Sequence, residues 1–467
     1  ATAMRRWTVG SAATMRWTAG ARRLCTTGTP LDAMTKALLA TDKPTRKQIV
    51  ELTQALPPTG VSIVALHKAA ADAAHSEDMQ LLNAKFVRRE LAARRAYGLS
   101  MLMRAEEVGG SGLRALSRQP QVEHLRSEYW RRLRQMLEFP QIRSMEDESE
   151  FYELMCQASA AELGETRAAY GQALAALRDE RGDEPGSSEE LEISSFLDSF
   201  FSQRVGLHFL VDHYIASKQP KEGFAGLIQT DCSPVGLIKD LSKQIEESLK
   251  ASFGASPVVQ FHGDESDTFS FVPSHIEFVV GEVLRNAMHA TVKHHLQKDD
   301  GRLTDLPPVK VIVAASDKNV NVKVADTAGG IPRSQLRNLW SYHGKALKRW
   351  GQGVGLGLPL ARVFAKYFGG SVHTVPMEGY GTDCYVAFNR LAHENCENIL
   401  KVPSFAAAAR DEELAKTKES EERPNQGKWR YAIRLFDAQA RRRSVPVGEE
   451  PTRDPTDGER IGGSRRW

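Results

Sequence analysis

The stretch that decides the fold is Gly351-Gln352-Gly353-Val354-Gly355-Leu356-Gly357-Leu358-Pro359, and a segment with helical apolar spacing follows it over residues 361–367. Alternating glycines directly before a helix expose several backbone N–H groups to an anion, and the helix dipole adds to the attraction. The stretch therefore favours a phosphate-binding loop over a merely flexible one. It does not indicate a Rossmann dinucleotide site, because no strand immediately precedes it and no ribose-binding acid follows at the expected spacing.

A second glycine turn lies upstream, in Val324-Ala325-Asp326-Thr327-Ala328-Gly329-Gly330. A strand pattern runs into the acid, and the glycines follow it. Such a carboxylate can accept a hydrogen bond from an exocyclic amine, while glycines let the backbone approach a flat ring. Taken alone, the stretch indicates an ordinary β-turn.

A helical pattern over residues 275–295 precedes both turns and contains Glu282 and Asn286. Residues four apart lie on the same face of a helix. A carboxylate there can take a proton from a hydroxyl or water, and an amide oxygen can ligate a hard divalent cation. On its own, this pair is more often a solvated helix face.

The remaining pattern predicts an α+β protein in two parts. Four amphipathic helices without strand signals between residues 45 and 215 favour a helical bundle, which we place at 45–218. Strand patterns at 309–313, 320–324, 371–375 and 384–388, flanked by helices at 275–295 and 358–368, predict an α/β sandwich over 220–395. Residues 396–467 form a charged C-terminal extension.

Composition limits the class of protein further. A chain of 467 residues is too long for one ordinary core, and 41% hydrophobic with 26% charged residues is typical of a soluble globular protein. A net charge of +3 argues against a nucleic-acid-coating protein, and no run approaches the roughly 18 apolar residues of a membrane helix. Five cysteines without a CxxC pair predict neither a disulfide framework nor a zinc ribbon.

Residues 1–30 contain five arginines and no acidic residue, with many Ser, Thr and Ala. This composition is typical of a mitochondrial presequence, which a negative-inside potential draws across the inner membrane. The alternative is an ordinary basic arm.

The order of the motifs resembles a known ATP-binding domain. E-x-x-x-N, then D-x-x-G-G about forty residues later, then G-x-G-x-G and Gly381-Thr382 resemble the domain of histidine kinases, gyrase-type, heat-shock chaperone and mismatch-repair ATPases. Within that superfamily, the chain is most similar to the mitochondrial 2-oxoacid dehydrogenase kinases, the pyruvate and branched-chain enzymes. The stretches that carry this similarity are 271–275, 285–291, 365–368 and 377–383, with 86–91 and 196–205 in the bundle.

The resemblance implies a regulatory four-helix bundle that binds lipoyl domains, followed by a nucleotide-binding sandwich of the histidine-kinase-like type. It implies transfer of the ATP γ-phosphate, with Mg²⁺, to a serine of a dehydrogenase subunit, in a homodimer of the mitochondrial matrix. Carried over by position, Glu282 is the general base, Asn286 the magnesium ligand, and Asp326 the partner of the adenine amine. The predicted nucleotide contacts are Asn286, His289, Asp326, Gly330, Gly353, Val354, Gly355, Leu356, Gly357, Leu358 and Thr382.

Four positions depart from the family pattern. Ala328 replaces the first glycine of the D-x-G-G-G turn, residues 341–350 replace a Ser/Thr-rich segment, and His289 replaces an arginine. Thr166-Arg167-Ala168 align with the position of a bundle histidine that meets the catalytic carboxylate in the family, and no histidine lies close by in the sequence. These departures keep open a nucleotide-binding pseudokinase, a structural or regulatory subunit of a mitochondrial assembly. A histidine kinase is a further alternative, with a phosphorylatable residue among His67, His75, His124, His208 and His213.

Overall fold

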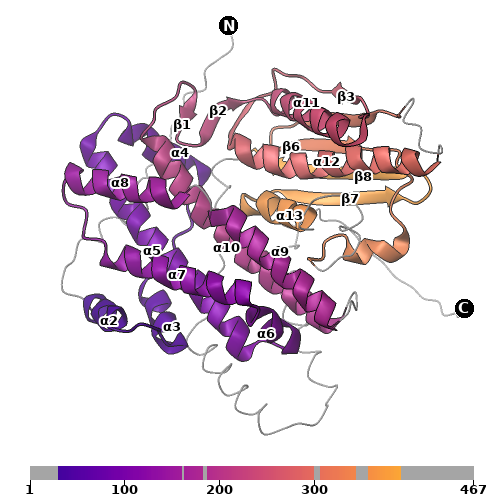
Figure 1. The fold of residues 1–467 in the computed structure, drawn as a ribbon. Coiled ribbons are helices and arrows are strands. Elements are labelled where there is room, and N and C mark those ends of the chain that lie inside the picture. The colour runs from indigo at the N-terminus through magenta and orange to yellow at the C-terminus, as the bar shows by residue number, and fades with distance from the viewer. Residues whose placement is uncertain (1–29, 160–161, 182–186, 299–305, 343–355, 391–467) are drawn as a thin grey trace, which may run out of the picture. The chain divides into compact units, whose positions relative to one another are not determined.

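The computed structural model describes residues 30–159, 162–181, 187–298, 306–342 and 356–390 (Figure 1). The predicted presequence, apart from Pro30, and the predicted extension at 396–467 lie outside these residues. Among the residues that the structure describes, no helix combines the length and apolar character that a membrane crossing requires.

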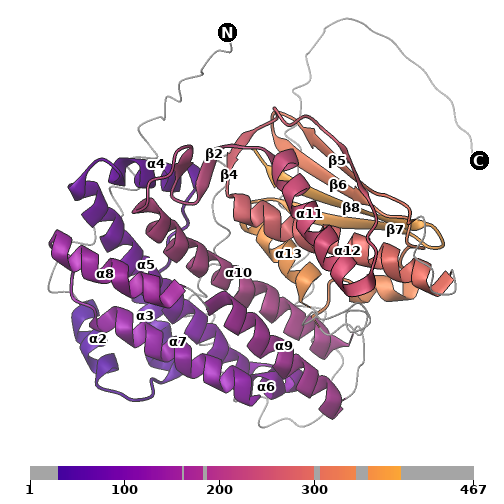
Figure 2. The ribbon, with the colours of Figure 1, turned by 45° about the horizontal axis from the view of Figure 1, so that its top comes forward.

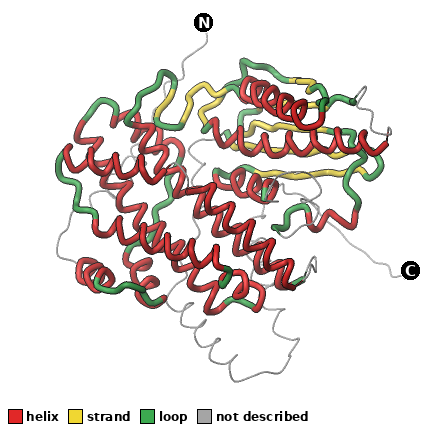
Figure 3. Tube along the Cα trace, viewed as in Figure 1, coloured by secondary structure: helices red, strands yellow, loops and turns green. Residues whose placement is uncertain are grey.

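The first half of the described chain is helical up to α10, as the periodicity predicts (Figure 3). Its helices are α2 (Pro30–Leu39), α3 (Arg46–Ala55), α4 (Ile63–Ala73), α5 (Glu77–Val108), α6 (Ser111–Ser117), α7 (Pro120–Glu138), α8 (Met145–Ser159), α9 (Glu162–Arg181) and α10 (Ser188–Ser217). Four of them, α5, α7, α9 and α10, contact one another in a closed ring, which confirms the predicted bundle. Burial of apolar side chains stabilises this packing. Helix α10 carries an apolar ridge at four-residue spacing, Leu197, Phe201, Val205 and Phe209, and each of these side chains is at most 2% exposed.

A helix boundary lies inside a segment without the usual helix breakers. Residues 61–97 contain neither proline nor glycine, but the structure divides them between α4 and α5. Ser76 has an extended backbone (φ −148°, ψ 123°), and Glu77 and Asp78 begin the next helix. Serine followed by two acids is a helix-start signal, since acidic side chains are stabilised at the positive end of a helix.

The second half is an α/β sandwich (Figure 2). Its strands are β1 (Phe224–Ala225), β2 (Ile228–Cys232), β3 (Val259–His262), β4 (Phe269–Phe271), β5 (Val309–Ala315), β6 (Asn319–Ala325), β7 (Ser371–Met377) and β8 (Gly381–Asn389). Strands β3-β5-β6-β8-β7 form a mixed sheet, and β1-β2-β4 form a small separate one. Helices α11 (Pro234–Phe253), α12 (Pro273–Lys298) and α13 (Gly357–Tyr367) cover one face of the larger sheet, and a 3₁₀ helix spans Arg333–Asn338.

Alternating burial fixes which face of the sheet meets these helices. The valines at 309, 311 and 313 in β5 and at 320, 322 and 324 in β6 are at most 7% exposed, while Lys310 and Asn321 point outward. Successive side chains of a strand lie on opposite faces, so these valines form the floor on which the helices pack. The two strands pair antiparallel, as the hairpin pattern predicts, with Val313 opposite Val322.

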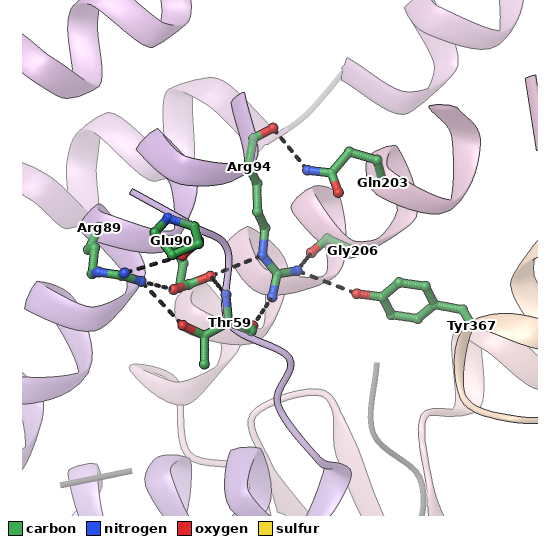
Figure 4. Close-up of polar contacts among 8 residues, drawn as sticks. Thr59, Arg89, Glu90, Arg94, Gln203, Gly206 and Tyr367 are labelled. Atoms are coloured by element: carbon green, nitrogen blue, oxygen red, sulfur yellow. Dashed lines mark hydrogen bonds and ion pairs between the residues drawn. The ribbon is translucent and has the colours of Figure 1, made fainter. Parts of the chain in front are cut away.

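A buried polar network joins the bundle to the end of α13 (Figure 4). The Arg94 guanidinium, 1% exposed, donates to the carbonyls of Gly206 (3.0 Å) and Thr59 (3.2 Å) and to the Tyr367 hydroxyl (3.4 Å). Its Nε lies 3.5 Å from the carboxylate of Glu90, which is fully buried. Residues from α5, α10 and α13 thus share one cation, so the two halves meet through specific contacts.

Candidate nucleotide-binding and catalytic site

Helix α12 carries the predicted acid and amide. Glu282 and Asn286 lie one turn apart on this helix, and His289 follows within the next turn. The Glu282 side chain is only 13% exposed, and Asn286 is half-buried. The structure therefore places both groups on one side of a helix that packs against β6, β8 and α13.

The Glu282 carboxylate lies against the start of α13. A Cβ atom at Gly357 would overlap Oε2 of Glu282, so any larger residue there would displace the carboxylate. The close approach of α12 and α13 at this point therefore explains why residue 357 is glycine. The carboxylate lies beside the N-terminus of α13, where the first N–H groups of a helix have no partner within the helix and the helix dipole is positive.

Two guanidinium groups flank the other oxygen of Glu282. Arg285 Nη1 lies 3.2 Å from Oε1 on the same helix, and Nη2 of Arg167, from bundle helix α9, lies 3.9 Å from it. Arg167 is one of the three residues that align with the family's bundle histidine. The bundle therefore does reach the predicted base, but with a fixed positive charge in place of an imidazole.

Asp326 is the buried acid of the site, at 8% exposure. Its Oδ1 accepts hydrogen bonds from the backbone N–H groups of Ala328 (2.9 Å) and Thr382 (3.2 Å). Burial raises the pKa of Asp326 to about 6, against the opposing effect of these two bonds. The group is therefore ionised above that pH, and only one of its two oxygens is used by these bonds.

The glycine turn at 328–330 packs against the turn between β7 and β8, at 378–380, beside Asp326. Gly329 and Gly330 have positive φ angles of 80° and 72°, and the N–H of Gly329 donates to Tyr380 O at 3.0 Å. A Cβ atom at Gly330 would overlap the Met377 carbonyl, and one at Gly381 would overlap the carbonyl of Asp326. These approaches require glycine and explain the D-x-x-G-G pattern.

Ala328 fits this turn despite its departure from the family pattern. Its side chain is buried at 8% exposure, and its N–H makes the bond to Asp326 described above. The substitution therefore leaves the carboxylate-holding turn intact.

The glycine ribbon is described only at its end. Leu356 is fully buried and caps α13, its carbonyl accepting from the N–H of Leu360 at 3.0 Å, and Leu358 is 7% exposed. The predicted contacts Gly353, Val354 and Gly355 lie outside the described residues. The structure therefore locates the helix that follows the ribbon, with its N-terminus at Glu282.

Two further residues lie near the site: His289, which the sequence predicted as a nucleotide contact, and Thr327, which it did not. His289, a predicted contact, packs edge-on against Phe253 at 5.7 Å; burial lowers its pKa, and the nearby Lys293 and Arg285 lower it further. Its imidazole is therefore neutral at pH 7. Thr327, which sequence reasoning missed, follows Asp326 directly and has a buried hydroxyl without a hydrogen-bond partner. An unpaired buried hydroxyl beside the acid is a candidate further contact for a ligand.

One side chain of the site could ligate a hard divalent cation. The described residues contain no group of three or more His, Cys, Asp or Glu side chains placed to hold a metal ion. Mg²⁺ keeps several waters and commonly binds one or two protein oxygens together with substrate phosphates. Asn286, one turn from Glu282, offers such an oxygen.

The fold and motif order define an ATPase of the histidine-kinase-like type. Residues 272–392 match the family model of the histidine kinase-, DNA gyrase B- and HSP90-like ATPases. Residues 61–239 match the model of the mitochondrial branched-chain alpha-ketoacid dehydrogenase kinase. The predicted fold class is thereby confirmed for both halves.

Similar proteins of known name identify the family within this class of ATPases. The chain is 30% identical over 331 residues to the mitochondrial pyruvate dehydrogenase (acetyl-transferring) kinase of Arabidopsis thaliana, covering 67% of this chain and 85% of that one. It is 34% identical over 219 residues to the kinase of the same name from Schizosaccharomyces pombe (43% and 51%), and 29% identical over 245 residues to isozyme 4 from Homo sapiens (48% and 57%). The chain belongs to the mitochondrial 2-oxoacid dehydrogenase kinase family.

Proposed function

We propose that the chain is an ATP-dependent protein serine kinase that phosphorylates a dehydrogenase subunit of a mitochondrial 2-oxoacid dehydrogenase complex. Relatives named pyruvate dehydrogenase kinase, spanning most of the chain, support the reaction class. The observation that carries the proposal is the position of Glu282, whose carboxylate lies against the first residue of α13. A base at the end of a phosphate-binding ribbon is where a transferred γ-phosphate and its acceptor hydroxyl would meet.

Each proposed role follows from the chemical group that the side chain offers to the substrate. The Glu282 carboxylate takes the serine proton while the serine oxygen bonds to the γ-phosphorus and the bond to the bridging oxygen of ADP breaks. Asn286 contributes its amide oxygen to Mg²⁺, which neutralises phosphate charge. Phosphoryl transfer depends mostly on such positioning and charge neutralisation. Asp326 accepts from the adenine amine with the oxygen that the backbone leaves unused, and Thr382 supports it.

The pseudokinase alternative is not favoured. The relatives carry kinase names, and Ala328 leaves its turn intact. We also propose, on the family resemblance, a matrix location, a homodimer, and anchoring of the bundle to lipoyl domains.

Phosphate transfer from γ-labelled ATP tests the proposal. Purified protein is incubated with Mg²⁺, ATP and a 2-oxoacid dehydrogenase complex, and wild type is compared with Glu282→Gln. Glu247→Gln, the same substitution at an exposed position of α11, is the matched control. We expect acid-stable phosphate on a dehydrogenase serine, and a loss of at least about 100-fold in the Glu282 variant only, since general bases contribute 10²–10⁴-fold.

Two results would contradict different parts of this proposal. Equal transfer by wild type and Glu282→Gln would remove Glu282 from the mechanism. Acid-labile phosphate on the protein itself would instead indicate a histidine kinase. His213 is a poor candidate for that role, because its Nε2 lies 3.2 Å from the Leu66 carbonyl and its Nδ1 accepts from the Leu227 N–H.

A further inference from the structure

Two segments that are separate in sequence meet on one side of bundle helix α10. The first is Trp340-Ser341-Tyr342, which follows the 3₁₀ helix. The second is the middle of α13, which begins at Gly357 beside Glu282. Their shared contact is Asp198, in the third turn of α10.

Tyr342 is seated on α10 by packing and by one hydrogen bond. It is 2% exposed, and its ring stacks on Phe201 with centroids 5.9 Å apart and planes 15° apart. Its hydroxyl donates to Oδ1 of Asp198 at 2.8 Å. Burial and the Asp198 carboxylate raise the pKa of Tyr342 well above its usual value, so the hydroxyl stays a donor.

Arg362 takes the other oxygen of the same carboxylate. Its Nη2 donates to Oδ2 of Asp198 at 2.8 Å, and its guanidinium lies over the Trp340 ring, 5.3 Å from the centroid. The Arg362 side chain is 21% exposed and that of Asp198 32%, so both charges are partly shielded from water. Hydrogen bonds to ionised groups are shorter and stronger than neutral ones. One carboxylate therefore links α10, Tyr342 and α13.

We propose that Asp198 is a positioning residue for nucleotide binding. From the bundle it holds α13 at a fixed place relative to Tyr342, and thereby holds the N-terminus of α13 against Glu282. The inference rests on the proposed function, since it assumes that ATP phosphates bind at that N-terminus. It adds that nucleotide affinity depends on the packing of α10. Because coupling between sites is reciprocal, a ligand that shifts α10 would change ATP affinity, and ATP would change the affinity for that ligand.

The test is the affinity for Mg²⁺-ATP, measured by calorimetry, together with steady-state phosphorylation of the dehydrogenase complex. Asp198→Asn removes the ion pair with Arg362 at almost unchanged volume, and Asp240→Asn is the control, a carboxylate that is 75% exposed on α11. We expect Asp198→Asn to weaken ATP binding by about tenfold, within the 5–150-fold range of typical coupling free energies. The KM for ATP rises correspondingly, and kcat falls by a smaller factor than KM rises, because Glu282 and Asn286 themselves are unchanged.

A double-mutant cycle separates positioning from a general loss of stability. Arg362→Gln should weaken binding to a similar degree, Arg362→Lys should restore part of it, and Asp198→Asn combined with Arg362→Gln should cost less than the sum of both. Tyr342→Phe removes one hydrogen bond and no packing surface, so it decides the question if Asp198→Asn does not fold. We expect it to weaken ATP binding by a factor of about three to ten.

Failure of the proposed function and failure of the positioning role give different results. If wild type shows no ATP binding, the proposed function is wrong and Asp198 has nothing to position. If wild type binds ATP and the Asp198 and Tyr342 variants bind it equally well, the function stands and the positioning role is wrong. A variant that loses kcat at unchanged KM for ATP also overturns the positioning role.

Discussion

Replacing Asp326 by asparagine should stabilise the free protein while weakening nucleotide binding. Asparagine keeps an Oδ1 acceptor for the N–H groups of Ala328 and Thr382 and has almost the same volume. It removes a negative charge that is 8% exposed. The site thus holds a carboxylate that is unfavourable for folding, which is expected where a buried acid serves a ligand.

The size of the gain follows from the pKa of Asp326, which burial raises from 3.8 to about 6. The folded protein binds this proton more tightly than the unfolded chain, so stability falls as pH rises through the interval between the two values. The full cost, about 3 kcal/mol at about 1.4 kcal/mol for each pKa unit, is present above pH 6 and absent below about pH 4. Asp326→Asn should recover up to this amount at pH 7.5, and about half of it at pH 5.

Nucleotide affinity should change in the opposite direction. In the proposed nucleotide site, the oxygen of Asp326 that the backbone does not use becomes an NH₂ group, which would face the adenine amine donor to donor. Leaving such groups unpaired costs roughly 1–3 kcal/mol, so the Kd for ATP should rise about 5- to 150-fold.

Urea unfolding followed by circular dichroism at pH 7.5 and pH 5, with calorimetric ATP titration, measures both effects. Asp317→Asn, at an exposed carboxylate in the β5–β6 turn, controls for charge alone. If Asp326→Asn were no more stable than wild type at pH 7.5, or if its advantage did not shrink at pH 5, the reasoning about the buried charge would be refuted.

Three further substitutions test separate parts of the structure. Asn286→Ala should abolish the part of ATP affinity that EDTA removes in wild type, and an EDTA-sensitive affinity retained in the variant would exclude the amide as the metal ligand. Gly330→Ala should lower stability by at least about 1–2 kcal/mol in urea unfolding, since φ is 72° and a Cβ would overlap the Met377 carbonyl; an unchanged midpoint contradicts this. Glu90→Ala should cost about 3–5 kcal/mol, because it leaves Arg94 buried without its carboxylate, and a loss below about 1 kcal/mol would show that pair to be unimportant.

Local patterns carried enough information for the architecture. The alternation of Val320, Val322 and Val324 with Asn321 and Lys323 predicts a strand, and the structure forms β6 there and buries all three valines. The four-residue ridge on α10 is buried for the same reason, since only one stripe of a helix can face the bundle. Such periodicities record which side of an element meets the core, and that is the information a single sequence holds best.

Helix α11 and the short strands β1, β3 and β4 were not predicted from the sequence. Helix α11 has Ser233 as N-cap, Pro234 at its first turn and Gly254 beyond its end with φ 78°, signals that sequence reasoning did not use. Strands β1, β3 and β4 have two to four residues each and are too short to show an alternation. Their pairing depends on partners distant in the chain.

In the site too, features with a local sequence signal were predicted, and contacts that depend on tertiary packing were not. The motif acid and its glycine turn were predicted from the sequence, because the turn needs positive φ and close backbone approach that only glycine permits. The contacts of Arg167 with Glu282 and of Asp198 with Tyr342 and Arg362 have no local signal. They arise only when the bundle packs on the sandwich, so tertiary structure was needed to find them.

Calorimetric titration of the pure, folded chain with Mg²⁺-ATP tests the central claim most directly. We predict saturable binding at one site per chain, strongly weakened in Asp326→Asn and insensitive to Asp317→Asn. No detectable heat from adenine nucleotides at millimolar concentration would contradict the assignment of a nucleotide site between α12, Asp326 and the start of α13.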